Sequence, residues 1–62
     1  MKRQWLVKLR ISKNLTQMEV AQRAGISRAY YTEIEIGKKK PSPVVAQKLC
    51  IVLGFDWTIF FN

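Results

Sequence analysis

Apolar residues are spaced along this chain as they are in short amphipathic helices. Near the start, Trp5, Leu6 and Leu9 recur on one helical face, which predicts a helix over about residues 2–12. Further along, residues 43–53 carry apolar side chains at positions i, i+3, i+4 and i+7, a stripe that predicts a second amphipathic helix. This second helix starts with a proline, which is favourable in a first turn. The pattern therefore predicts helices towards both ends of the chain.

Capping sequences predict two further helices in the middle of the chain. Thr16 and Glu19 form a T-x-x-E capping box, and Gly25 supplies the left-handed residue that commonly ends a helix, so we expect about eight helical residues between them. Ser27 is a capping residue for the next helix, which we expect to end at Ile36. Because so few residues separate these two helices, the turn between them must be tight.

Two segments also have features of strands. Residues 33–36 alternate polar and apolar side chains, but the preceding cap and Gly37 favour a helix. Residues 57–61 have strand propensity as well, although we expect Asp56 to cap a last short helix there. The prediction is a single all-α domain over residues 1–62, a compact body of five short helices.

The composition excludes several classes of function. There is one cysteine, Cys50, and no histidine, so neither an intrachain disulfide nor a zinc site of ordinary ligand count can form. Cys50 lies on the apolar stripe, and no pair of nucleophile and base is in view, so we expect no enzyme, no metal and no cofactor. No apolar run matches a membrane span or a signal peptide, and we expect a cytoplasmic protein without a membrane partner. A chain of this length leaves no room for a sensor domain, so we also expect no small-molecule ligand.

The charge of the chain is strongly one-sided. Eleven Lys and Arg residues stand against four Asp and Glu, which gives a net charge of +7. Such a field attracts polyanions, of which nucleic acid is the commonest in a cytoplasm. Positive charge also serves solubility alone, so the charge by itself leaves both interpretations open.

The two central helices and the tight glycine turn between them form a helix-turn-helix unit. The small side chain of Ala21 permits the two helices to cross closely, and Gly25 adopts the positive φ that other residues resist. The positions that such a unit buries are apolar in this chain: Val20, Ala24, Ile26, Tyr31 and Ile34. The combination, rather than the glycine alone, indicates the motif.

The same segments resemble the lambda-repressor and Cro type of phage and bacterial transcriptional regulators, also called the XRE family. The resemblance runs from about Leu6 to Phe60 and is carried by Leu15-Thr16-Gln17, Glu19-Val20-Ala21, Ala24-Gly25-Ile26-Ser27, Ile34-Glu35, Gly37, Pro41-Ser42 and Leu53-Gly54. Tyr31 and Ile36 depart from the pattern, in which an aliphatic and a polar residue are usual. The resemblance implies a lambda-repressor-like fold of bacterial or phage origin that binds double-stranded DNA sequence-specifically and represses by occupying an operator.

The resemblance implies that Gln17 contacts the phosphate backbone and that the following helix reads bases through Ser27, Arg28, Ala29 and Glu33. Elementary chemistry agrees, because the first turn of such a helix points into the major groove. There Arg28 can donate two hydrogen bonds to guanine, Ala29 can touch a thymine methyl group, and Glu33 can accept from cytosine N4. Two alternatives stay open: Arg28 contacts phosphate alone, and Glu33 is held by a neighbouring basic residue.

A second group of residues is expected to bind the DNA backbone without choosing a sequence. Lys38, Lys39 and Lys40 follow the reading helix directly, and their alternative is a solvated loop. The N–H groups after Ser42 form an anion site at the start of a helix. Tyr30 is expected to contact a phosphate or to stack on a sugar, and the alternative is that it is a surface tyrosine without contact to DNA.

The C-terminal end carries more apolar residues than one short helix buries. In the resembled family this end often forms a dimer contact, which implies a homodimer on a palindromic operator through Ile51, Val52, Trp57, Ile59, Phe60 and Phe61. The alternative is that these residues complete the core of a monomer. A different function also stays open, a protein-interaction module that binds a larger regulator or a toxin through the aromatic end. The resemblance further suggests an ion pair between Arg10 and Glu35, which we assign to structure.

Overall fold

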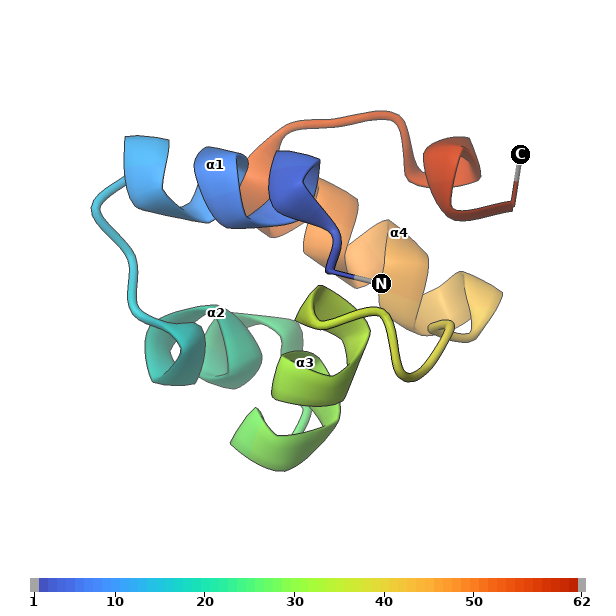
Figure 1. The fold of residues 1–62 in the computed structure, drawn as a ribbon, viewed down its shortest axis with the longest axis horizontal. Coiled ribbons are helices and arrows are strands. Elements are labelled where there is room, and N and C mark those ends of the chain that lie inside the picture. The colour runs from blue at the N-terminus through green and yellow to red at the C-terminus, as the bar shows by residue number, and fades with distance from the viewer. Residues whose placement is uncertain (1, 62) are drawn as a thin grey trace.

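The computed structural model describes residues 2–61 and shows four α-helices and one 3-10 helix (Figure 1). In chain order they are α1 (Gln4–Ser12), α2 (Gln17–Ala24), α3 (Arg28–Glu35), α4 (Pro43–Leu53) and the 3-10 helix η1 (Trp57–Phe61). No strand occurs among residues 2–61, so the all-helical prediction is confirmed for that part of the chain. The expectation of five α-helices needs one correction, because the last element is a 3-10 helix, a tighter form that is used in short pieces.

The capping box determines the start of α2 as expected. The Thr16 hydroxyl accepts from the Glu19 N–H at 3.1 Å, and the Glu19 carboxylate accepts from the Thr16 N–H at 2.9 Å. The hydrogen bond from the Thr16 backbone lowers the pKa of Glu19 below its usual value. At the other end, Gly25 adopts a φ of 70° and terminates the helix. Both boundaries of α2 therefore follow from local sequence.

Serine residues cap the next two α-helices in the same way. The Ser27 hydroxyl accepts from the Tyr30 N–H at 3.1 Å, and the Ser42 hydroxyl accepts from the Val45 N–H at 3.3 Å. α4 ends before Gly54, whose φ is 74°, and has the predicted bounds. The predicted third helix is confirmed, with Ser27 as its cap and Arg28 as its first helical residue.

Side chains from every helix meet in one core. In Figure 1, α1 runs along the top of the domain and α2 and α3 lie below it, while α4 crosses the middle of the view and packs against α2 and η1. α2 contacts both α3 and α4, so the helix-turn-helix is supported from behind by the last α-helix. The buried hydrophobic residues are Leu6, Leu15, Val20, Ala21, Ala24, Tyr31, Ile34, Ala46, Leu49, Leu53 and Phe60. Cys50, which was expected on the core stripe, is half-buried.

A buried ion pair joins α1 to α3. Arg10 Nε lies 2.8 Å from Glu35 Oε2, and Arg10 Nη2 lies 3.2 Å from Glu35 Oε1. The side chain of Glu35 is 1% exposed and that of Arg10 is 14% exposed. Arg10 also donates to the Leu15 carbonyl at 3.0 Å. The ion pair that the resemblance suggested is confirmed, and it holds the helix-turn-helix against the first helix.

Arg3 ties the N-terminal residues to α3 and η1. Its backbone N–H donates to the Glu35 carbonyl at 2.8 Å, and its guanidinium donates to the carbonyls of Ile34 and Lys39. The guanidinium also lies 5.3 Å from the centroid of the Phe60 ring. A cation beside the last carbonyls of α3 is favourable because the C-terminus of a helix carries partial negative charge. These contacts hold Arg3 outside α1, which explains why the helix begins at Gln4.

The aromatic residues near the C-terminus pack largely within the domain. The ring of Trp5 lies 5.2 Å from those of both Phe55 and Phe60, measured between centroids. Asp56 accepts from the Thr58 N–H at 3.1 Å, which is the cap expected there. Phe60 is only 6% exposed. This ring belongs to the core of the domain, as in the alternative of a monomer core, so little of its surface is left for the predicted dimer contact.

Candidate nucleic-acid interface

The helix-turn-helix presents one face of α3 to solvent. α2 and α3 pack against each other around the fully buried Ala21, and the Ile26 N–H donates to the Ala21 carbonyl at 3.0 Å to close the turn. Tyr31 faces the core on one side of α3. On the other side, Arg28 and Ala29 are exposed in the first helical turn. The fold thus places outward the two residues that were predicted to read bases at the start of this helix.

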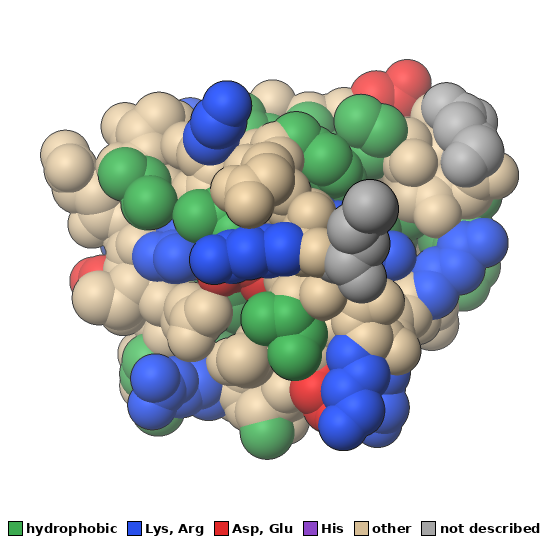
Figure 2. Space-filling model, in the orientation of Figure 1, with side chains coloured by type: hydrophobic (Ala, Val, Ile, Leu, Met, Phe, Trp, Pro, Cys, Tyr) green, Lys and Arg blue, Asp and Glu red, His purple; other side chains and the backbone are tan. Residues whose placement is uncertain are grey.

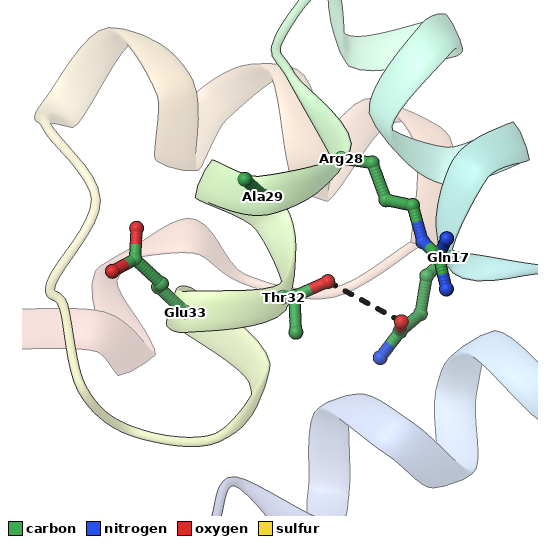
Figure 3. Close-up of a pocket in the computed structure, with 5 residues that line it drawn as sticks. All are labelled: Gln17, Arg28, Ala29, Thr32 and Glu33. Carbon is green, nitrogen blue, oxygen red and sulfur yellow. Dashed lines mark hydrogen bonds between the residues drawn. The ribbon is translucent and has the colours of Figure 1, made fainter.

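A hollow of about 560 Å³ opens beside this face (Figure 3). Its lining combines the start of α2 with one face of α3: Gln17, Arg28, Ala29, Thr32 and Glu33. All of these residues except Thr32 were predicted from the sequence, and the fold brings Gln17 and Glu33 to the same hollow although they are far apart in the chain. Thr32 was missed. Since it follows Arg28 by four residues and Ala29 by three, helical periodicity already placed it on the same face.

The side chain of Gln17 points from α2 into this site and is anchored on its inner side. Its Nε2 donates to Glu35 Oε1 at 2.9 Å, and its Oε1 accepts from the Thr32 hydroxyl at 3.3 Å. One N–H of the amide is therefore used inside the protein, and the second remains able to donate outward. Sequence reasoning gave Gln17 a backbone contact but did not detect this link to the buried carboxylate.

Glu33 is held by two lysines. Its carboxylate lies 3.4 Å from Lys39 Nζ and 3.8 Å from Lys38 Nζ. Its backbone carbonyl accepts from the backbone N–H of Lys39 at 3.1 Å and from that of Lys38 at 2.9 Å. The structure thus shows the arrangement that was left open as the alternative, a carboxylate held by neighbouring basic residues. The loop after α3 is folded against the helix by these contacts, so Lys38 and Lys39 lie beside the hollow.

The remaining residues predicted to contact the DNA backbone are Lys40, Tyr30 and Ser42. The Nζ of Lys40 lies 4.9 Å from the centroid of the Phe61 ring. Tyr30 is half-buried and packs against the core, which leaves only part of its side chain accessible. After Ser42, Pro43 has no N–H and the Val45 N–H is capped. The anion site expected there is thus reduced, because neither of these two amides can donate to a phosphate.

The apolar residues that were predicted at a dimer interface divide into separate groups. Ile51 is 82% exposed and, together with Val52, lines a second hollow between α2 and α4. Ile59 and Phe61 are 43% and 37% exposed at the C-terminal end. Trp57 is half-buried and packs against the core. The exposed apolar surface at this end therefore consists mainly of Ile59 and Phe61.

The electrostatic character of the surface follows from where the four carboxylates lie. Each is engaged within the domain: Glu19 in a capping box, Glu33 with lysines, Glu35 with Arg10, and Asp56 in a cap. Figure 2 accordingly shows Lys and Arg side chains spread over the visible face with few Asp or Glu between them. Over residues 2–61 the structure holds no group of three potential metal ligands and no helix long and apolar enough to cross a membrane. The surface is that of a small basic domain.

These features define a class of protein, a helix-turn-helix domain with an exposed second helix. Comparison with known sequences agrees, since the profile of a family described as Helix-turn-helix matches residues 6–60. The chain is similar to the uncharacterized HTH-type transcriptional regulator YqaF of Bacillus subtilis, with 59% identity in an alignment that covers the whole chain and 82% of the relative. It is also similar to the uncharacterized HTH-type transcriptional regulator y4dJ of Sinorhizobium fredii, with 38% identity in an alignment that covers 76% of the chain and 61% of the relative. No solved structure gave a significant match.

The chain therefore belongs to the helix-turn-helix family of the lambda-repressor and Cro type. The match covers the same stretch, from about residue 6 to residue 60, over which the sequence motifs were recognised.

Proposed function

We propose that this protein binds double-stranded DNA sequence-specifically and regulates transcription as a repressor that occupies an operator. The observation that carries this proposal is the exposure of Arg28 and Ala29 in the first turn of α3, beside a hollow that also includes Gln17 of α2. A helix held in this way enters a major groove with its N-terminal residues against the base edges. The names of the two relatives, both HTH-type transcriptional regulators, support the same role.

The roles within the site follow from chemistry. Arg28 donates to guanine O6 and N7, and Ala29 contacts a thymine methyl group. Ser27 keeps its hydroxyl proton for a base or a phosphate, since its oxygen accepts from the Tyr30 N–H. Lys38 and Lys39 meet the phosphate backbone beside the groove, and a phosphate there competes with the carboxylate of Glu33 for both lysines.

Selection of bound sequences from random duplexes tests this function directly. The unaltered protein should enrich one motif, and Arg28→Ala should weaken binding to that motif by about 1–3 kcal/mol and relax the choice at one base pair. Arg23→Ala is the matched control, because Arg23 is an exposed arginine of α2 that lines the other hollow. The base-reading role is wrong if Arg28→Ala weakens binding to all duplexes equally, as a phosphate contact would.

We also propose that the protein acts as a homodimer through the C-terminal end. Ile59 and Phe61 leave exposed apolar surface there, next to the half-buried Trp57. A two-fold dimer would place two α3 helices about 34 Å apart, which matches a palindromic operator. The selected motif should then contain two inverted half-sites.

Replacing both exposed residues, Ile59→Ser with Phe61→Ser, tests the dimer. The variant should sediment as a monomer at concentrations at which the unaltered protein is a dimer, and it should bind a full operator no more tightly than a half-site. Ile11→Ser, which removes an exposed isoleucine of α1 that is not predicted at the interface, is the control and should leave the mass unchanged. A monomeric unaltered protein, or a shift caused by Ile11→Ser, would contradict this assignment.

A further inference from the structure

A continuous chain of hydrogen bonds leads from the buried core to the hollow beside α3. It begins at Glu35, whose carboxylate accepts from Arg10, from the Tyr31 hydroxyl at 2.7 Å and from Gln17 Nε2 at 2.9 Å. It continues from Gln17 Oε1 to the hydroxyl of Thr32, 3.3 Å away. Glu35 is 1% exposed, whereas Gln17 and Thr32 are half-exposed and line the hollow (Figure 3).

The carboxylate determines the direction of every bond in this chain. Burial acts to raise the pKa of Glu35, but the hydrogen bonds from Arg10, Tyr31 and Gln17 outweigh it and hold the pKa below its usual value. The group is therefore ionised near neutral pH and can only accept. Tyr31 and Arg10 Nε donate to Oε2, while Gln17 donates to Oε1, which also accepts from Arg10 Nη2.

The orientation of the Gln17 amide follows without ambiguity. Its NH₂ end must face the carboxylate, because the opposite orientation would set two acceptor oxygens against each other. The amide oxygen is thereby turned towards Thr32, and in this contact the threonine hydroxyl must be the donor. At 3.3 Å the contact is longer than an ordinary bond between oxygens, so it biases the hydroxyl rather than locking it. In the favoured orientation the single proton of the hydroxyl points inward, which leaves its lone pairs available on the side of the hollow.

We infer that Thr32 reads the major groove as a hydrogen-bond acceptor and that Gln17 is the positioning residue that sets this polarity. The inference rests on the proposed function, because it assigns a base preference to the same site. In the major groove the donors are the amino groups of adenine N6 and cytosine N4, while guanine and thymine offer acceptors. Thr32 therefore favours an amino base at the position that it faces. Arg28, one helical turn earlier, has only donors and favours guanine.

The test is binding-site selection with four proteins: the unaltered chain, Thr32→Val, Thr32→Ser and Gln17→Met. Thr32→Val keeps the shape of the side chain and removes the hydroxyl. At one base pair the unaltered protein should prefer one base over the others by about five- to tenfold, which is what one hydrogen bond contributes. Thr32→Val should lose this preference. Thr32→Ser should retain the preference for adenine or cytosine there. Gln17→Met should flatten the same position although Thr32 is intact.

A base analogue provides a measurement that does not depend on folding of a variant. Replacing the preferred base by its analogue without the exocyclic amino group should weaken binding of the unaltered protein as much as Thr32→Val does. The same analogue should have no further effect on Thr32→Val. Gln22→Met, at an exposed glutamine of α2 outside the chain of bonds, is the control for Gln17→Met and should leave the motif unchanged.

Three results would overturn the inference while leaving the proposed function in place. The first is a motif that Arg28→Ala alters and Thr32→Val does not. The second is a preference for guanine or thymine at the base pair that Thr32→Val alters. The third is a Gln17→Met protein that folds and keeps the adenine or cytosine preference. If the unaltered protein selects no motif at all, the proposed function itself fails.

Discussion

Replacing Arg10 by methionine is expected to lower the free energy of unfolding by about 3–5 kcal/mol, because it leaves the buried carboxylate of Glu35 without its counter-ion. Domains of this size have total stabilities of only about 3–9 kcal/mol, so the variant should be close to unfolding at room temperature. Urea unfolding followed by circular dichroism measures the difference. The Glu35 side chain is 1% exposed, so solvent cannot replace the lost guanidinium.

Two control variants separate the charge from the packing. Adding Glu35→Gln to Arg10→Met removes the buried charge and keeps one amide oxygen as an acceptor for Tyr31 or Gln17, so it should recover part of the loss. Lys38→Met breaks an ion pair whose partners are 69% and 28% exposed, and it should cost at most about 1 kcal/mol. A loss below about 1 kcal/mol for Arg10→Met would show that the ion pair does not support the fold.

The same carboxylate makes stability depend on acidity. The folded-state pKa of Glu35 lies below its unfolded value of 4.5, since hydrogen bonds to the ionised form outweigh burial. The unfolded chain then binds the proton more tightly, so this group contributes stability above pH 4.5 that is lost as the pH falls through the folded pKa. Unfolding of the unaltered protein should therefore become easier in acid.

Replacing Lys38, Lys39 and Lys40 by glutamine should weaken DNA binding about a thousandfold at 0.1 M salt, if each lysine meets one phosphate and releases its counter-ions. The slope of log affinity against log salt should fall by close to 3 for the same reason. Binding titrations of the selected duplex and of an unrelated duplex, at several salt concentrations, measure both quantities. The loss should be similar for the two duplexes, since phosphate contacts carry no sequence information. An unchanged slope would remove the loop from the interface.

Glu33→Gln distinguishes two roles of Glu33, ion pairing with the lysines of this loop and acceptance of a hydrogen bond from a base. The carboxylate lies 3.4 Å from Lys39 and 3.8 Å from Lys38, so its removal frees two lysines and takes one negative charge from the interface. Binding should strengthen on all duplexes and the salt slope should steepen. If Glu33 instead accepts from a cytosine, Glu33→Gln should weaken binding at one base pair alone. The two outcomes differ in sign, which decides the role of this residue.

Much of the fold follows from local sequence, because helix boundaries depend on contacts within a few residues. The Thr16 capping box, the left-handed Gly25 and the serine caps of α3 and α4 all lie where the sequence predicts them. The helical face of Arg28 and Ala29 could be assigned for the same reason, since 3.6-residue periodicity alone determines which residues share a face.

Other properties depend on residues that are distant in the chain. Phe60 is buried beside Phe55, which lies close in sequence, and beside Trp5 from the other end of the chain, and no local pattern indicates the contact with Trp5. The orientation of the Gln17 amide is set by Glu35, eighteen residues later. Sequence alone thus determined most helix boundaries, the caps, the basic charge and which residues share the exposed face of α3. The tertiary structure decided which polar atoms of that surface are already engaged, because hydrogen-bond partners depend on how helices pack rather than on their periodicity.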